Sequence, residues 1–154
     1  MMDNKYMPIS LLVGVIAMVW VFVCNIYEWP SWAGFIGWSV YFYGGAKPEA
    51  IKTSGPGFLL GAFLAMAAVG VMGMLPPDNP YLAVIPVFFL SFLMTFAQNI
   101  DWFQIAPATF LGSATFFGTG DVFDTIVVGF LLGMVVLGLV TTYANKWLTN
   151  ILSK

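Results

Sequence analysis

Residues 57–61 read GFLLG, and the same five letters return at residues 129–133, 72 positions later. Upstream of each copy lies a second set of matches, offset by 75 positions. Ala33, Phe35, Gly37, Phe42 and Gly45 have identical partners at Ala108, Phe110, Gly112, Phe117 and Gly120. Ordered matches at a nearly constant offset indicate an internal duplication. We therefore predict one membrane domain, residues 1–154, made of repeat one at about residues 6–77 and repeat two at about residues 79–147.

Clusters of charge cut the chain into six uncharged runs of 18 to 25 residues. The runs are 6–27, 29–46, 53–77, 79–100, 102–120 and 125–145. An α-helix needs roughly 20 apolar residues to cross the hydrocarbon of a bilayer. Hydrophobic residues make up 60% of the chain, charged residues 8%, and the mean hydropathy is +0.92. The sequence predicts an all-α polytopic membrane protein with six transmembrane helices, arranged as two inverted three-helix repeats.

The basic residues predict the orientation, because lysines and arginines near the spans favour the cytoplasmic side. The five lysines are Lys5, Lys47, Lys52, Lys146 and Lys154, and arginine is absent. Six crossings place all five on the face that carries both termini. If runs two and five were re-entrant loops, the lysines would divide three against two. The sequence thus favours six crossings with both termini cytoplasmic.

An odd number of spans in each repeat reverses the direction in which repeat two enters the membrane. Inverted repeats of this kind build channels and transporters whose solute path lies near the midplane, where the repeats meet. The short middle run of each repeat begins near Pro30 or Pro107 and ends at Gly44 or Gly118, which predicts compact helices with defined ends. Glycine and alanine pairs four positions apart, such as Gly57 with Gly61, can also be explained without transport, because this spacing lets helices pack closely.

Neutral polar residues in or beside the short spans are the candidate lining of a solute path. They are Asn25, Ser39, Tyr41, Asn99, Thr109, Ser113 and Thr115. Glu28 and Asp101 occupy nearly equivalent places before the two short spans and are candidate mouth or coupling carboxylates. The alternative is that these two acids cap the adjoining short helices or mark the water boundary.

Several chemistries are excluded by missing residue types. The chain has no histidine and one cysteine, so it lacks the ligands of a typical zinc, haem or iron–sulfur site. It contains no phosphate-binding loop and no nucleophile elbow. We expect no enzymatic activity, catalytic residue, metal or cofactor. The net charge of -2 predicts no nucleic-acid partner, and the expected surroundings are the lipid bilayer.

Two motifs in the short spans resemble a known family. Residues 31–37 (SWAGFIG) with Tyr41 and Phe42, and residues 107–112 (PATFLG) with residues 114–116 (ATF), are similar to the YcdZ-like small inner-membrane proteins of bacteria. The likeness extends through most of the chain, with the same order of spans. This resemblance implies the bacterial inner membrane, and it implies no activity or functional residue, because the family is one of unknown function.

Three functions agree with these observations. The first is a passive channel or facilitator for a small, polar, mostly uncharged solute. The second is an accessory membrane protein that binds or organises a partner and has no solute path. The third is a proton-coupled transporter in which Glu28 or Asp101 titrates, and indifference of uptake to a pH gradient would contradict it. Self-association would help to shield a polar path from lipid, so a homo-oligomer is compatible with the first function.

Overall fold

The computed structural model describes residues 7–76, 78–118 and 123–153, and all regular structure in these ranges is helical. The first half contains α1 (Met7–Tyr27), α2 (Ser31–Tyr43) and α3 (Ala50–Met72). The second half begins with η2 (Pro80–Ala83), α4 (Val84–Phe96), η3 (Ala97–Asn99), η4 (Asp101–Phe103) and α5 (Ala106–Phe117). It ends with a continuous helix made of α6 (Phe123–Val127), the π-helix η5 (Val128–Leu137) and α7 (Gly138–Leu152).

Within the described residues, four helical segments are long and apolar enough to cross a membrane. They are Met7–Tyr27, Ala50–Met72, Tyr81–Asn99 and Asp124–Leu152. The two remaining helices, α2 and α5, have 13 and 12 residues. At 1.5 Å per residue they extend only about 20 Å, against a hydrocarbon core of about 30 Å. The fold is thus all-helical and multi-pass, with four spans of sufficient length where the sequence predicted six.

The ends of the short helices agree with the sequence prediction. Pro30 directly precedes α2, and Pro107 lies in the first turn of α5, where the missing N–H of proline breaks no helical hydrogen bond. Gly44 and Gly118 come directly after the last helical residues. The short middle element of each predicted repeat is therefore a compact helix of fewer than four turns.

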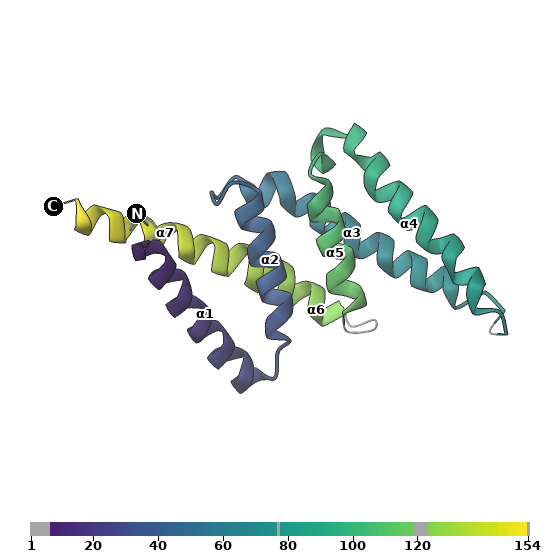
Figure 1. The fold of residues 1–154 in the computed structure, drawn as a ribbon, viewed down its shortest axis with the longest axis horizontal. Coiled ribbons are helices and arrows are strands. Elements are labelled where there is room, and N and C mark those ends of the chain that lie inside the picture. Colours follow the sequence, from purple (N-terminus) through teal and green to yellow (C-terminus); the bar gives the residue numbers. More distant parts are fainter. Residues whose placement is uncertain (1–6, 77, 119–122, 154) are drawn as a thin grey trace, which may run out of the picture.

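The helices are arranged around two central elements, α2 and α5, which run in opposite directions (Figure 1). From this centre α3 extends to the right, where α4 covers it, and α7 extends to the left, where α1 approaches it. The most extensive packing joins α3 to α5 and α2 to η5. Each short helix therefore packs mainly on a long helix from the other half of the chain.

Glycines allow these helices to touch through their backbones. A Cβ atom on Gly61 would overlap the carbonyl of Thr109, and one on Gly133 would overlap the carbonyl of Gly34. At the next contact along, a Cβ on Gly112 would overlap the carbonyl of Phe58. No side chain larger than hydrogen fits at these crossings. The small residues four apart thus serve close helix packing, as small residues do in membrane proteins.

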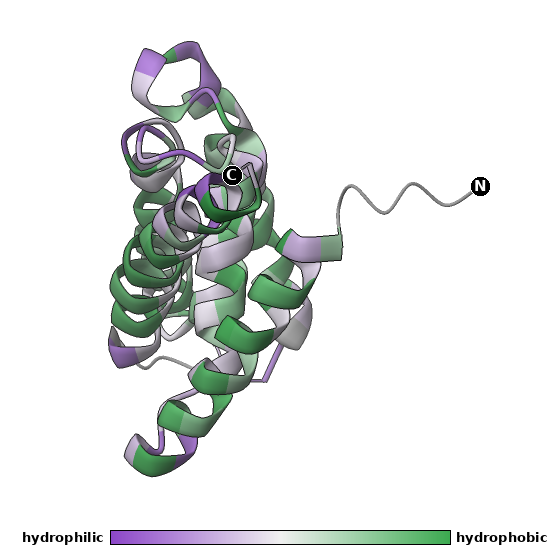
Figure 2. Cartoon of the chain, turned by 90° about the vertical axis from the view of Figure 1, so that its left-hand side faces the viewer, coloured by the Kyte–Doolittle hydropathy of each residue, from purple (hydrophilic) through white to green (hydrophobic). Residues whose placement is uncertain are grey.

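Hydrophilic residues lie mainly at the ends of the helices, and the middles of the helices are apolar (Figure 2). The apolar surface includes phenylalanines on the outer side of α4. The ring of Phe92 stacks on those of Phe88 and Phe96. These three side chains are exposed on the protein surface. An apolar outer surface with polar ends is suited to a lipid environment.

Candidate functional site

Four of the seven residues predicted to line a path are buried in the helical core. Tyr41, Thr109 and Thr115 have no exposed surface, and Ser113 is 5% exposed. The hydroxyls of Thr109 and Thr115 donate to carbonyls of their own helix, at 2.8 Å from Ala106 O and 2.8 Å from Leu111 O. Such internal bonds satisfy a hydroxyl in apolar surroundings. None of the four belongs to the walls of the charged cavities at the ends of the short helices.

The other three predicted residues lie on the surface of the protein. Asn25, Ser39 and Asn99 are exposed. Ser39 Oγ donates to Ile36 O at 2.6 Å, and Asn99 Nδ2 donates to Phe96 O at 2.7 Å. The structure therefore does not bring the seven residues together, and their role in lining a path stays a prediction.

One cavity with charged walls lies at the start of α2. It has a volume of about 790 Å³, and both Glu28 and Asp124 line it. Pro30, Thr125 and Val128 are also among its walls. Glu28 adopts a left-handed backbone conformation, with φ of 56°, in the tight turn between α1 and α2. This cavity is thus bounded by two carboxylates, one from each half of the chain.

A second charged cavity lies at the start of α5, which is the opposite end of the antiparallel pair α2 and α5 (Figure 1). Its volume is about 700 Å³, and Lys52 and Asp101 line it. Asp101 Oδ1 accepts a hydrogen bond from Gln104 Nε2 at 3.1 Å. This cavity carries one cation and one anion, in contrast to the two acids of the first.

The walls of the two cavities correspond to each other in sequence. Lys52, Thr53 and Pro56 line the second cavity, and the residues 72 positions later, Asp124, Thr125 and Val128, line the first. This is the offset that relates the two GFLLG segments. Three wall positions of the second cavity thus match three wall positions of the first at this offset.

Tightly packed side chains fill the space along the helices between these cavities. Phe58 follows the wall residue Pro56 of the second cavity by two positions, and Phe130 lies between the wall residues Val128 and Leu131 of the first. The two phenylalanines match at the 72-residue offset, and their rings stack with centroids 6.1 Å apart. Phe58 and Met134 have no exposed surface. The centre of the molecule is therefore filled, mainly by apolar side chains and also by buried hydroxyls such as those of Thr109 and Thr115.

Two side-chain hydrogen bonds join α2 to α7, and we call this pair of contacts the α2–α7 latch. Trp38 Nε1 donates to Thr141 Oγ1 at 3.0 Å, and the hydroxyls of Tyr41 and Thr142 share a bond of 2.6 Å. Thr142 Oγ1 is also 3.2 Å from the carbonyl oxygen of Ala46, just beyond α2. The latch thus fixes the end of α2 against the last helix.

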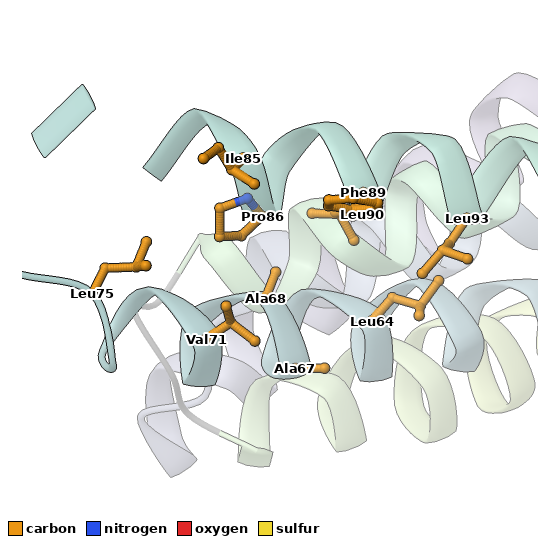
Figure 3. Close-up of a pocket in the computed structure, with 10 residues that line it drawn as sticks. All are labelled: Leu64, Ala67, Ala68, Val71, Leu75, Ile85, Pro86, Phe89, Leu90 and Leu93. Carbon is orange, nitrogen blue, oxygen red and sulfur yellow. The ribbon is translucent and has the colours of Figure 1, made fainter. Parts of the chain in front are cut away.

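Three further cavities are grooves with mainly apolar walls. The groove between α3 and α4, with a volume of about 340 Å³, is lined entirely by apolar side chains such as Leu64, Phe89 and Leu93 (Figure 3). A similar groove of about 470 Å³ lies between α1 and the end of α7. A third, of about 520 Å³, lies beside Phe63 and Phe130. The walls of these three grooves carry no charged side chain.

The sequence prediction named Glu28 and Asp101 but missed Lys52 and Asp124 as cavity residues. The signal for them was present, because Lys52 and Asp124 are equivalent at the 72-residue offset. Thr141 and Thr142 were missed because their equivalents in the first half are Val69 and Gly70, which have no polar side chain. A search for repeated residues cannot find a contact that only one half makes.

Together, the helical fold, the apolar outer surface and the four long apolar segments define an integral, multi-pass membrane protein. Among the described residues, no group of acidic or cysteine side chains could hold a metal ion. The chain belongs to the DUF1097 family of proteins of unknown function, whose model matches residues 10–150.

Two relatives are named inner membrane protein YcdZ. The one from Escherichia coli (strain K12) is 31% identical over 137 residues, which cover 84% of this chain and 82% of the relative. The one from Salmonella typhimurium (strain LT2) is 28% identical over 155 residues, which cover 96% and 91%. No solved structure matches the chain. The protein is accordingly a multi-pass protein of the inner membrane, as the resemblance of its short-span motifs implied.

Proposed function

We propose that the two halves are inverted repeats related by a pseudo-two-fold axis between Phe58 and Phe130. The packing of α5 on α3 corresponds to that of α2 on η5 when the halves are exchanged. The contact of Gly61 with Thr109 corresponds in the same way to that of Gly133 with Gly34, at offsets of 72 and 75 residues. In this arrangement α2 and α5 act as short central spans, which makes six crossings with cytoplasmic termini.

We propose that the protein is a passive facilitator for a small, polar, uncharged solute and that the structure is its closed state. The pair of equivalent charged cavities at opposite ends of α2 and α5 carries this proposal. The cavities act as vestibules on the two membrane faces, and the stacked rings of Phe58 and Phe130 close the route between them. Opening requires that this contact and the side chains packed around it, such as Met134, move apart, and no charged group of the described core has to move.

The function is tested by solute flux into liposomes that contain the purified protein. Stopped-flow shrinkage with urea, formamide, glycerol and small amino alcohols as probes should reveal entry of at least one of them. Phe130→Ala should raise the flux because it removes half of the closing contact, while Phe88→Ala, on the outer surface of α4, should not. The absence of flux for every probe, with both the unmodified protein and Phe130→Ala, would contradict the facilitator.

The proposed topology is tested separately by labelling single cysteines introduced into a Cys24→Ser background. Glu28→Cys and Asp124→Cys should react from outside the cell with a maleimide that cannot cross membranes. Lys52→Cys and Asp101→Cys should react only after the membrane is opened. Labelling of all four variants from one side would exclude vestibules on opposite faces.

A second candidate is the accessory membrane protein, because a filled apolar core is what a protein without a solute path would have. Its partner would contact the exposed apolar surface of α4, which includes Phe88 and Phe92. Cross-linking in cells from unnatural photoreactive residues at these two positions should then capture one protein in a fixed ratio. Capture of lipid alone would count against this function.

A further inference from the structure

The two GFLLG segments are wound differently although their sequences are identical. Residues 57–61 belong to the α-helix α3, whereas residues 129–133 belong to the π-helix η5. A π-helix has i→i+5 hydrogen bonds in place of the i→i+4 bonds of an α-helix, and it occurs mostly as single turns at functional sites. Because the five residues are the same, their own propensities cannot favour both windings. What differs is the flanking sequence, with Pro56 before one segment and Val128 before the other, and the packing around the two segments.

The packing differs in a way that involves α7. The π-helix η5 continues directly into α7, which the α2–α7 latch holds through Thr141 and Thr142. The equivalent positions in α3 are Val69 and Gly70, which cannot form such bonds. The half that is held by a latch is therefore the half with the π winding.

Rewinding η5 as an α-helix would turn α7 relative to α6. A π-helix turns less per residue than an α-helix, because its hydrogen bonds span five residues in place of four, and over the ten residues of η5 this difference adds up to a large rotation of the downstream helix. Thr141 and Thr142 would then face away from Trp38 and Tyr41, so both bonds of the latch would break. The winding of η5 and the closure of α2 against α7 are thus mechanically linked.

We propose that η5 is a winding switch, in which the π form holds the latch closed and the α form releases α7 from α2. Its role in gating rests on the proposed facilitator, because release of α7 would loosen the contact of α2 with η5 beside Phe130. The α-wound segment of α3 represents the winding that η5 adopts after release. No bound ligand is needed for this device, only two windings of similar free energy.

Amide hydrogen exchange in lipid nanodiscs tests the switch. The amides of residues 58–61 and 130–133 share the same preceding residues, so their intrinsic exchange rates are equal and each segment is the reference for the other. Local opening sets the difference between them. We expect residues 130–133 to exchange about tenfold faster than residues 58–61.

Removal of the latch supplies the second half of the test. The double variant Trp38→Phe and Tyr41→Phe releases the latch, so η5 should take the α winding. The exchange rate at residues 130–133 should then fall about tenfold, and the rate at residues 58–61 should stay unchanged. Tyr43→Phe is the matched control, because Tyr43 lies on the exposed side of α2. Equal exchange in both segments, or an equal change in both after latch removal, would overturn the switch. If the asymmetry is found but no probe solute crosses liposomes, the facilitator fails and the switch stands.

Discussion

The contact of α5 with α3 and the contact of α2 with η5 have the same design and different outcomes. In both, a glycine of the long helix meets the backbone of a short helix, Gly61 against Thr109 and Gly133 against Gly34. The first long helix is α-wound and has no latch, whereas the second is π-wound and joined to α2 by Trp38 and Tyr41. The difference teaches that two long helices with the same GFLLG segment can make the same kind of glycine crossing and still be wound differently.

The largest effect is expected from filling the crossings themselves. Gly61→Val and Gly133→Val should each abolish folding or cost at least about 3 kcal/mol, because the new side chain meets backbone that cannot move aside. Monodisperse recovery in detergent and thermal unfolding measure this. Gly70→Val is the control, since nothing lies within 4 Å of a Cβ there. A mild effect at Gly133 alone would indicate that the π-helix packs less tightly against α2 than α3 packs against α5.

The stacked phenylalanines should respond unequally. Phe58→Ala should cost about 3–5 kcal/mol because Phe58 is fully buried and leaves a cavity. Phe130 is only partly buried, so Phe130→Ala should cost clearly less, about 1–2 kcal/mol. Unfolding in detergent of both variants gives the comparison, and equal losses would contradict the packing described for Phe130.

The α2–α7 latch should contribute less to the free energy of unfolding than these packing contacts, and only one half of the chain has a latch. Trp38→Phe and Thr141→Val should each lower stability by about 1 kcal/mol, the typical net value of a hydrogen bond. A double-mutant cycle should give a coupling of about 0.6 kcal/mol, as side-chain bonds in membrane proteins do on average. The equivalent change in the other half, Val69→Thr, should create no coupling with Ser113. Coupling there would mean that both halves are latched.

The smallest effect concerns the turn after α2. Ala46 has φ of 55°, a left-handed conformation that is unfavourable for residues with a Cβ. Ala46→Gly should raise stability by up to about 1 kcal/mol, and the control Ala97→Gly, in a helical conformation with φ of -59°, should lower it by a similar amount. Thermal unfolding distinguishes the two, and a loss at Ala46 would show that its backbone contact with Thr142 depends on the alanine.

The elements that were predictable from sequence are those set by composition and by local chemistry. The boundaries of α2 were predicted by Pro30 and Gly44, and the long helices by uncharged runs. The cavity residues were only half predictable: Glu28 was found beside a short span, but its neighbour in the cavity, Asp124, comes from the distant start of α6. Burial of Thr109 and Thr115 was not predictable. A threonine whose hydroxyl bonds within its own helix cannot be distinguished, from sequence alone, from a threonine that lines a path.

The sequence by itself determined that this chain is helical, resides in a membrane, and carries a duplicated pattern, because apolar run length and spacing are local properties of the chain. Only the tertiary structure decided which helices pack across one another and that side chains fill the centre. It also decided that identical GFLLG segments are wound as α-helix and π-helix. The physical reason is that each of these depends on backbone contacts between segments about 50 to 100 residues apart, whose free energy no local pattern encodes.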